Sequence, residues 1–321
     1  MQVTKLMGPY VYVIGLRDPV YNVATDNNPN IVYKATISSM KLIAAVLFLA
    51  LFGVSSCNAK SLRATPITDE ELLALSKNLH INDVNTSDLT DVFTKPTYAA
   101  AQGLLNNYAR NYSVQEEFTP EQLAEEVAFI DLVMETSVMQ LLHEFLVSKG
   151  FFTEDVQEFK QFLWNKWFAR WSKYVPDVVA SGGWEHTNLG EKGSDGILYG
   201  FHSWIHVYNE EQYGHLNYLG YIDVIKTDST TVMSIPILLN GNHVSSKPYT
   251  NLNVGASPEL ELALGTLCYI ARDGVDALCV FQTSDAIEYA MDVHSVDYNG
   301  SNYIESSHTS FGEESNGRSV L

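Results

Sequence analysis

Residues 181–205 read SGGWEHTNLGEKGSDGILYGFHSWI and contain two histidines, His186 and His202. An imidazole has an ordinary pKa of about 6.5, so a pair of them can supply a general base and a general acid near neutral pH. Glycines lie on both sides of His186, and Gly200 precedes His202. Glycine-rich segments turn easily and display their side chains. The stretch therefore predicts a site for proton transfer.

A lysine further along the chain completes this set. Lys247 follows His202 by 45 residues, and its ammonium can neutralise negative charge that builds up between the imidazoles. The combination suits cleavage of an RNA phosphodiester, in which one histidine deprotonates the ribose 2′-OH and the other protonates the leaving 5′-oxygen. DNA lacks the 2′-OH, so we expect His186, His202 and Lys247 to act on RNA and not on DNA.

The local pattern gives each histidine an expected setting. His186 lies between Glu185 and Glu191 among glycines, which predicts an exposed loop. Apolar residues with helical spacing run from Ile197 to Tyr208, and His202 follows Gly200 near the start of this expected helix. A helix N-terminus favours phosphate and lowers a histidine pKa, as a general base requires. Strand alternation fits this segment nearly as well.

Two metal hypotheses also follow from these residues. The carboxylates of Glu185 and Glu191 are suitable oxygen ligands for a hard cation such as Mn²⁺ or Ca²⁺. His202 and His206 form an H-x-x-x-H pair that could hold zinc on a helix, but Ser203 stands where a metalloprotease has its glutamate. A zinc hydrolase is therefore kept as an alternative class.

The part of the chain before residue 176 is predicted to be helical. Thr68 opens a capping box, and Thr119 precedes a proline at the first helical position. Another helix begins at Ser137 and can end at Gly150. A further helix is expected from about residue 154 to 171, with an aromatic stripe that we assign to the core.

Short β-rich runs follow Pro176. They cover residues 217–225 and 232–239, and Asn240-Gly241 is a turn signal. One helix interrupts them, with Ser257 as its cap and its end before Asp273-Gly274. Taken alone, these patterns predict a mixed α and β protein.

The 321 residues carry a net charge of −19, which argues against tight non-specific binding to polyanions. An apolar run between Met40 and Ala59, with a basic start and a small-residue end, is typical of a secretory signal peptide. We therefore expect residues 1–39 to be a leader of doubtful status, residues 40–59 to be removed, and the mature chain to be secreted.

Secretion bears on the cysteines and on glycosylation. Cys268 and Cys279 remain after removal of the signal peptide, either as one disulfide or as two buried thiols. Sequons begin at Asn85, Asn111 and Asn299, so a secreted glycoprotein is expected.

The motifs resemble one known family. Their order is Ser181-Gly182-Gly183-Trp184-Glu185-His186, Gly190-Glu191, Gly200-Phe201-His202-Ser203-Trp204-Ile205, Lys247 and Gly255-Ala256-Ser257-Pro258-Glu259-Leu260-Glu261-Leu262-Ala263-Leu264. Over about residues 62–311 the chain is similar to the EndoU family of poly(U)-specific endoribonucleases.

The resemblance implies an α+β fold, with a helical half over residues 60–176 and a catalytic half of antiparallel sheets and a few helices over 177–321. It also implies catalysis by His186, His202 and Lys247, functional roles for Glu185 and Glu191, stimulation by Mn²⁺ or Ca²⁺, and 2′,3′-cyclic phosphate products.

The chain departs from the family pattern in three places. Gly183 resembles an insertion, and Thr187-Asn188 replaces a more apolar pair. Near the C-terminus His308 stands where the family has a tyrosine, while Ser306 keeps a hydroxyl. We expect Ser306 to read the uracil edge and His308 to stack on the base, with a relaxed preference for uridine.

The expected substrate is single-stranded RNA, and the mature protein is expected to be a monomer that does not enter a membrane. The alternative is a catalytically weak secreted glycoprotein of the same fold, which binds RNA or another partner. The altered C-terminal motif favours this alternative, and the intact His186, His202 and Lys247 argue against it.

Overall fold

The computed structural model describes residues 64–83, 92–192, 196–239 and 245–311. The expected signal peptide, the leader, the Asn85 sequon and the Asn240-Gly241 turn lie outside these residues. Within the described ranges no helix has the length and apolar character needed to cross a membrane.

Helices dominate the first part of the described chain, and strands dominate the second. The helices are α2 (Asp69–Asn82), α4 (Pro96–Leu104), α5 (Pro120–Met134), α6 (Ser137–Ser148), α7 (Val156–Trp167), α8 (Gly183–Asn188), α9 (Trp204–Gln212) and α10 (Pro258–Ala271). The strands are β1 (Arg170–Trp171), β2 (Ser181–Gly182), β3 (Glu191–Lys192), β4 (Leu198–Tyr199), β5 (Leu216–Tyr218), β6 (Asp223–Lys226), β7 (Thr231–Leu239), β8 (Ser245–Val254), β9 (Ala277–Gln282), β10 (Glu288–Tyr298) and β11 (Ser301–Ser310).

Local capping signals place the helix starts. The Thr68 hydroxyl accepts from the Glu71 amide while Glu71 bonds back to Thr68, which is the predicted capping box of α2. Thr119 and Gln122 do the same for α5. Helix α6 begins at Ser137, and Gly150 follows its end with a φ of 80°. These predictions are confirmed. Each of them depends only on residues close together in the sequence, so the sequence alone was sufficient to make it.

The expected extent of α7 is wrong at its C-terminal end. The helix ends at Trp167, and Arg170 and Trp171 instead pair with Gly182 and Ser181 to form β1–β2. Pairing with a segment ten residues away overrides the helical periodicity there. The aromatic stripe of α7 is core, as predicted, since Trp167 is buried.

The named strands pair antiparallel in four sheets. Strands β9, β10 and β11 form one sheet in the order β11-β10-β9. A second sheet has the order β5-β7-β6, and β8 pairs with β7. The run predicted as one strand over 217–225 is divided between β5 and β6, with Gly220 between them at a φ of 102°. The α+β class is confirmed.

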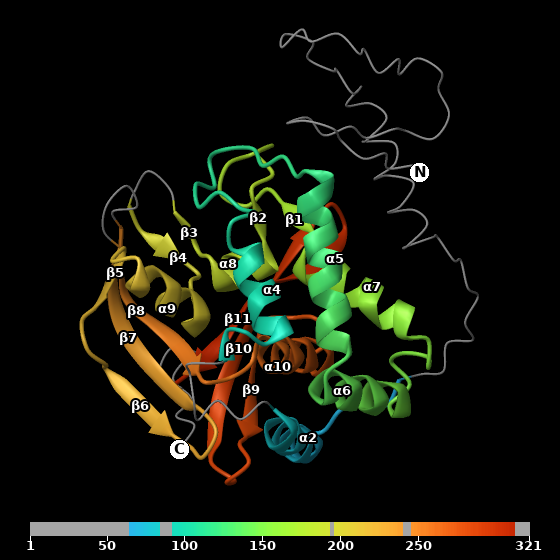
Figure 1. The fold of residues 1–321 in the computed structure, drawn as a ribbon. Coiled ribbons are helices and arrows are strands. Elements are labelled where there is room, and N and C mark those ends of the chain that lie inside the picture. The colour runs from blue at the N-terminus through green and yellow to red at the C-terminus, as the bar shows by residue number, and fades with distance from the viewer. Residues whose placement is uncertain (1–63, 84–91, 193–195, 240–244, 312–321) are drawn as a thin grey trace, which may run out of the picture. The chain divides into compact units, whose positions relative to one another are not determined.

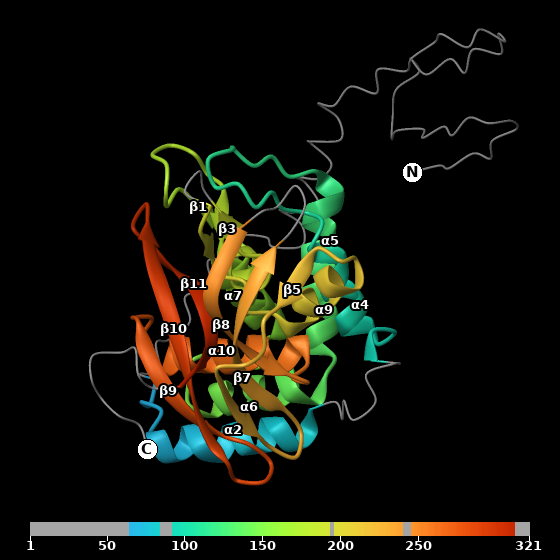
Figure 2. The same ribbon diagram turned by 90° about the vertical axis from the view of Figure 1, so that its left-hand side faces the viewer.

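Helix α10 joins the two halves. It is buried along most of its length and contacts α2, α4 and α6 as well as β9, β10 and β11. In Figure 1 the helices α5, α6 and α7 lie to the right of α10 and the β7–β8 sheet lies to its left, and in Figure 2 that sheet faces the viewer. Cys268 of α10 and Cys279 of β9 form a disulfide, which decides between the two alternatives left open by the sequence.

Candidate active site

His186 lies in helix α8 and not in an exposed loop, so the predicted exposure is wrong. Its relative exposure is 6% because the neighbouring Trp184 anchors α8 in the core. Gly183 begins this helix, and a Cβ there would lie 2.2 Å from the Ile304 carbonyl oxygen of β11. The glycine that departs from the family pattern therefore lets α8 lie directly against β11.

A buried carboxylate orients His186. Nδ1 of His186 lies 2.6 Å from Oε2 of Glu191 on β3, and Glu191 is fully buried. A carboxylate accepts, so Nδ1–H donates to it and the free nitrogen of the ring is Nε2. Glu191 fixes the tautomer of His186 and can stabilise the ring when it carries a proton.

A glycine brings the second histidine segment against the first. The Phe201 amide donates to the His186 carbonyl at 3.0 Å, and the His202 amide donates to the Thr187 carbonyl at 2.6 Å. Gly200 has a φ of 65°, and a Cβ there would lie only 1.8 Å from the His186 carbonyl oxygen. Only glycine permits this approach without a shift of the backbone.

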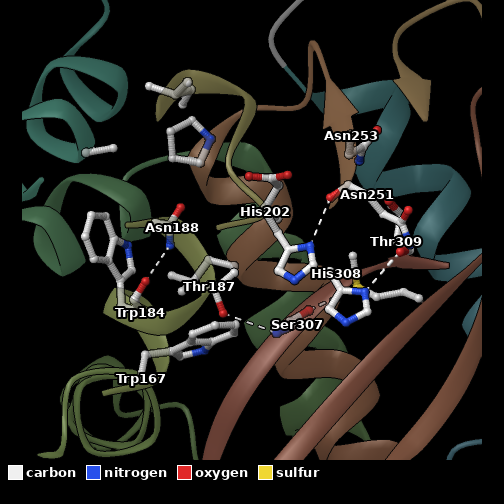
Figure 3. A pocket seen from close by; sticks show the side chains of 16 residues that line it. Trp167, Trp184, Thr187, Asn188, His202, Asn251, Asn253, Ser307, His308 and Thr309 are labelled. Atoms are coloured by element: carbon white, nitrogen blue, oxygen red, sulfur yellow. Dashed lines mark hydrogen bonds between the residues drawn. The ribbon is translucent and has the colours of Figure 1, made fainter. Parts of the chain in front are cut away.

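His202 lies just before helix α9, whose N-cap is Ser203. The expected helix is confirmed from Trp204 onward and wrong before it, because 198–199 form β4 and Phe201 has a φ of 65°. Nδ1 of His202 lies 3.1 Å from the Asn251 carbonyl oxygen of β8 (Figure 3). That oxygen only accepts, so the neutral ring carries its proton on Nδ1 and its lone pair on Nε2.

Lys247 of β8 lies at that lone pair. Its Nζ is 3.2 Å from Nε2 of His202 and also donates to the Gly200 carbonyl oxygen. Burial lowers the pKa of His202 well below its ordinary value, and Lys247 and His308 lower it further. The direction agrees with the expectation for a base, but burial is the largest cause, and the helix dipole is not needed.

His308 and Ser306, the two residues expected to bind the base, have different surroundings. His308 of β11 stacks on His202, with ring centroids 4.0 Å apart and 18° between the ring planes. His202 and His308 line a small cavity of about 30 Å³ together with Thr187 and Ser307 (Figure 3). Ser306 is 4% exposed and does not line this cavity.

Glu185 and Glu191 do not fit a metal site. Both are buried, and Glu191 is engaged by His186. Burial, with Glu116 and Glu191 nearby, raises the pKa of Glu185 well above its ordinary value. In the described parts of the chain no three His, Cys, Asp or Glu side chains are placed to hold one ion.

The zinc alternative is wrong for a related reason. Nε2 of His206 lies 2.8 Å from Nη2 of Arg110, and Nδ1 of His206 lies 3.0 Å from the Asn188 carbonyl oxygen. Both nitrogens of His206 are engaged inside the protein, so this ring does not share a ligand site with His202.

Sequence reasoning missed three supports of the site. Thr250 and Asn251 follow Lys247 on β8, and the Thr250 hydroxyl bonds to the Phe201 carbonyl oxygen at 2.6 Å. The amide of Ser307 donates to the Thr187 hydroxyl at 3.2 Å and joins β11 to α8. The polar residues that follow Lys247 were the available signal for the first two.

The chain is similar to known endoribonucleases. The family model described as Endoribonuclease XendoU matches residues 71–309. A human uridylate-specific endoribonuclease is 39% identical over 184 residues, which are 57% of this chain and 43% of that protein. The uridylate-specific endoribonuclease B of Danio rerio is 33% identical over 181 residues, which are 56% of this chain and 64% of that protein.

These matches span less than two thirds of the relatives' own lengths. The solved structure of XendoU, described as a splicing-independent snoRNA-processing endoribonuclease, is also similar to this chain. Its TM-score is 0.57 at 24% identity, and the match covers 83% of this chain and 96% of that one. That likeness supports the fold.

Proposed function

The chain belongs to the XendoU family of endoribonucleases, and we propose that it cleaves single-stranded RNA, preferentially at uridines, by attack of the ribose 2′-OH. The observation that carries this proposal is the position of Lys247 Nζ, 3.2 Å from the lone pair of a neutral His202. Glu191 orients His186, and the backbone amides of Phe201 and His202 donate hydrogen bonds to the carbonyl oxygens of His186 and Thr187.

In the proposed reaction His202 is the general base. Its Nε2 takes the proton of the 2′-OH while Nδ1–H remains on the Asn251 carbonyl oxygen. The 2′-oxygen then forms a bond to phosphorus, and the bond from phosphorus to the 5′-oxygen breaks. A lowered pKa keeps His202 unprotonated, and therefore able to accept this proton, at and below neutral pH.

His186 is the proposed general acid. Its Nδ1 is held by the Glu191 carboxylate, so a protonated ring presents Nε2–H to the leaving 5′-oxygen. Lys247 turns from His202 to the non-bridging phosphate oxygens and neutralises their charge. The products are a 2′,3′-cyclic phosphate and a 5′-hydroxyl, so protons and bonds balance.

The relatives named uridylate-specific and poly(U)-specific support the preference for uridine. Secretion, proposed from the Met40–Ala59 segment, is supported by the Cys268–Cys279 disulfide, since disulfides persist in oxidising compartments. Stimulation by Mn²⁺ or Ca²⁺ is proposed to act through the RNA, because Glu185 and Glu191 do not fit a metal site.

The test is incubation of the purified chain with an RNA oligonucleotide that contains one uridine. Cleavage 3′ of the uridine, with a cyclic phosphate end, is expected. A protein that binds the oligonucleotide tightly and leaves it intact would instead support the non-cleaving alternative.

A further inference from the structure

The ring of His308 is committed to a contact inside the protein. One face lies on the ring of His202 at a centroid distance of 4.0 Å, and the Nδ1 atom lies 3.1 Å from the Thr309 carbonyl oxygen. The ring centroid of His294 on β10 lies 5.7 Å from that of His308, with 41° between the two ring planes. Figure 3 shows His202 and His308 side by side at the cavity. The face that meets His202 is therefore not available to a nucleobase in this arrangement.

The same contact completes the support of His202. The hydrogen bond to the Asn251 carbonyl oxygen limits movement of the His202 ring within the plane of that ring. The stacked His308 ring limits movement of the His202 ring perpendicular to the same plane. We propose that His308 is a positioning residue for His202, which holds the ring in place and keeps water from one of its faces. This inference rests on the proposed role of His202 as the base.

The charged groups around His202 come from four elements. Lys247 of β8 lies at Nε2, and His186 of α8, in addition to His308 itself, contributes a repulsive interaction with a protonated His202. Glu261 of α10 lines the same cavity, and Asp292 of β10 is the register partner of His308.

His308 itself stays neutral under ordinary conditions. Burial lowers its pKa to about 3, so it carries no charge when His202 works. A flat, neutral ring can stay packed against the imidazolium that forms when His202 takes the substrate proton, since an aromatic face attracts a cation. A side chain without a ring would admit water to His202 and raise the pKa of His202 toward its ordinary value.

The test compares His308→Ala with His308→Phe, which keeps a flat ring and removes both nitrogens. In the full chain without RNA, NMR follows the titration of the His202 ring, whose signal is identified by its loss in His202→Ala. His308→Ala is expected to move that titration upward by about one pH unit, and His308→Phe, which removes the repulsion from the His308 nitrogens but keeps the ring, to move it by clearly less. The acid limb of kcat/KM is expected to move in the same way.

His215→Ala, at a histidine whose side chain is 52% exposed, is the control and should leave the His202 titration unchanged. Thermal unfolding shows which variants remain folded, and His308→Phe supplies a second measurement if His308→Ala unfolds. If His308→Ala only raises KM and leaves the His202 titration in place, the positioning role is overturned.

A shift of the His202 titration in His308→Phe as large as in His308→Ala would also overturn the stacking account. Because NMR needs no cleavage, failure of the wild-type chain to cut RNA would contradict the proposed function without deciding the role of His308.

Discussion

Nδ1 of His186 lies 2.6 Å from Oε2 of Glu191, and both residues are buried. The structure thus gives Glu191 the role of a carboxylate that orients an imidazole. In this place it resembles the buried acid that holds the catalytic histidine in hydrolytic triads. This contact engages Oε2 of the Glu191 carboxylate, which the sequence predicted to be a metal ligand.

Glu191→Gln is expected to lower kcat at least about 10-fold, because the amide can donate to Nδ1 and favour the wrong tautomer of His186. Steady-state cleavage of a uridine-containing oligonucleotide measures the change. Glu210→Gln is the matched control, since Glu210 lies 3.0 Å from Nε2 of His206, another buried histidine. Equal losses of kcat in the two variants would show that Glu191 has no special place in the reaction.

Gly200→Ala is expected to abolish cleavage, with a loss of at least about 100-fold, because a Cβ there would lie 1.8 Å from the His186 carbonyl oxygen. Gly214→Ala is the control. Gly214 has a φ of 70° and nothing within 4 Å of an added Cβ, so it should cost about 1–2 kcal/mol of stability without loss of activity. Urea unfolding and initial rates separate the two effects; a fully active Gly200→Ala would contradict the geometry.

Single removal of His186, His202 or Lys247 is expected to lower the cleavage rate at least about 100-fold, the scale of losing a general acid, a general base or a charge stabiliser. Alanine variants and initial rates measure this, with His215→Ala as the exposed control. Wild-type rates in either catalytic-histidine variant would remove that residue from the mechanism.

The pH dependence follows from the lowered pKa of His202. A base with a lowered pKa stays unprotonated to lower pH, so kcat/KM should hold its value as pH falls through 6.5 and decline only in more acidic solution. Initial rates at low substrate concentration across the acid range check this. An acid limb centred at the ordinary histidine value would mean that the buried setting of His202 is not kept in solution.

Divalent cations are expected to lower KM more than they raise kcat. The chain has a net charge of −19, so a counterion reduces repulsion of RNA without binding Glu185 or Glu191. Hexamminecobalt(III), which has no free coordination position, should then replace Mn²⁺. Stimulation by Mn²⁺ alone, with none by hexamminecobalt, would require protein ligands to the ion.

Local signals predicted much of the fold. The caps at Thr68, Thr119 and Ser257 gave the starts of three helices, because a cap depends on residues within one turn. The end of α7 could not be found in this way, since it depends on pairing between Trp171 and Ser181.

In the candidate site, too, some features can be predicted from nearby residues and others depend on contacts between distant segments. The chemistry of His186, His202 and Lys247 can be inferred from residue types and from the family resemblance. The burial of His186 and its bond to Glu191 depend on how α8 packs against β11 and on where β3 places Glu191, which no short pattern encodes. The stack of His308 on His202 joins residues 106 positions apart and was likewise beyond sequence reasoning.

In the proposed reaction His202, His186 and Lys247 cut RNA through its own 2′-OH. The most direct measurement compares one oligonucleotide that contains a single ribouridine with the same oligonucleotide that contains 2′-deoxyuridine there, with product ends identified by mass spectrometry. We expect cleavage of the first to a 2′,3′-cyclic phosphate and no cleavage of the second. Cleavage of the 2′-deoxy oligonucleotide at that position, or a product without the cyclic phosphate, would contradict it.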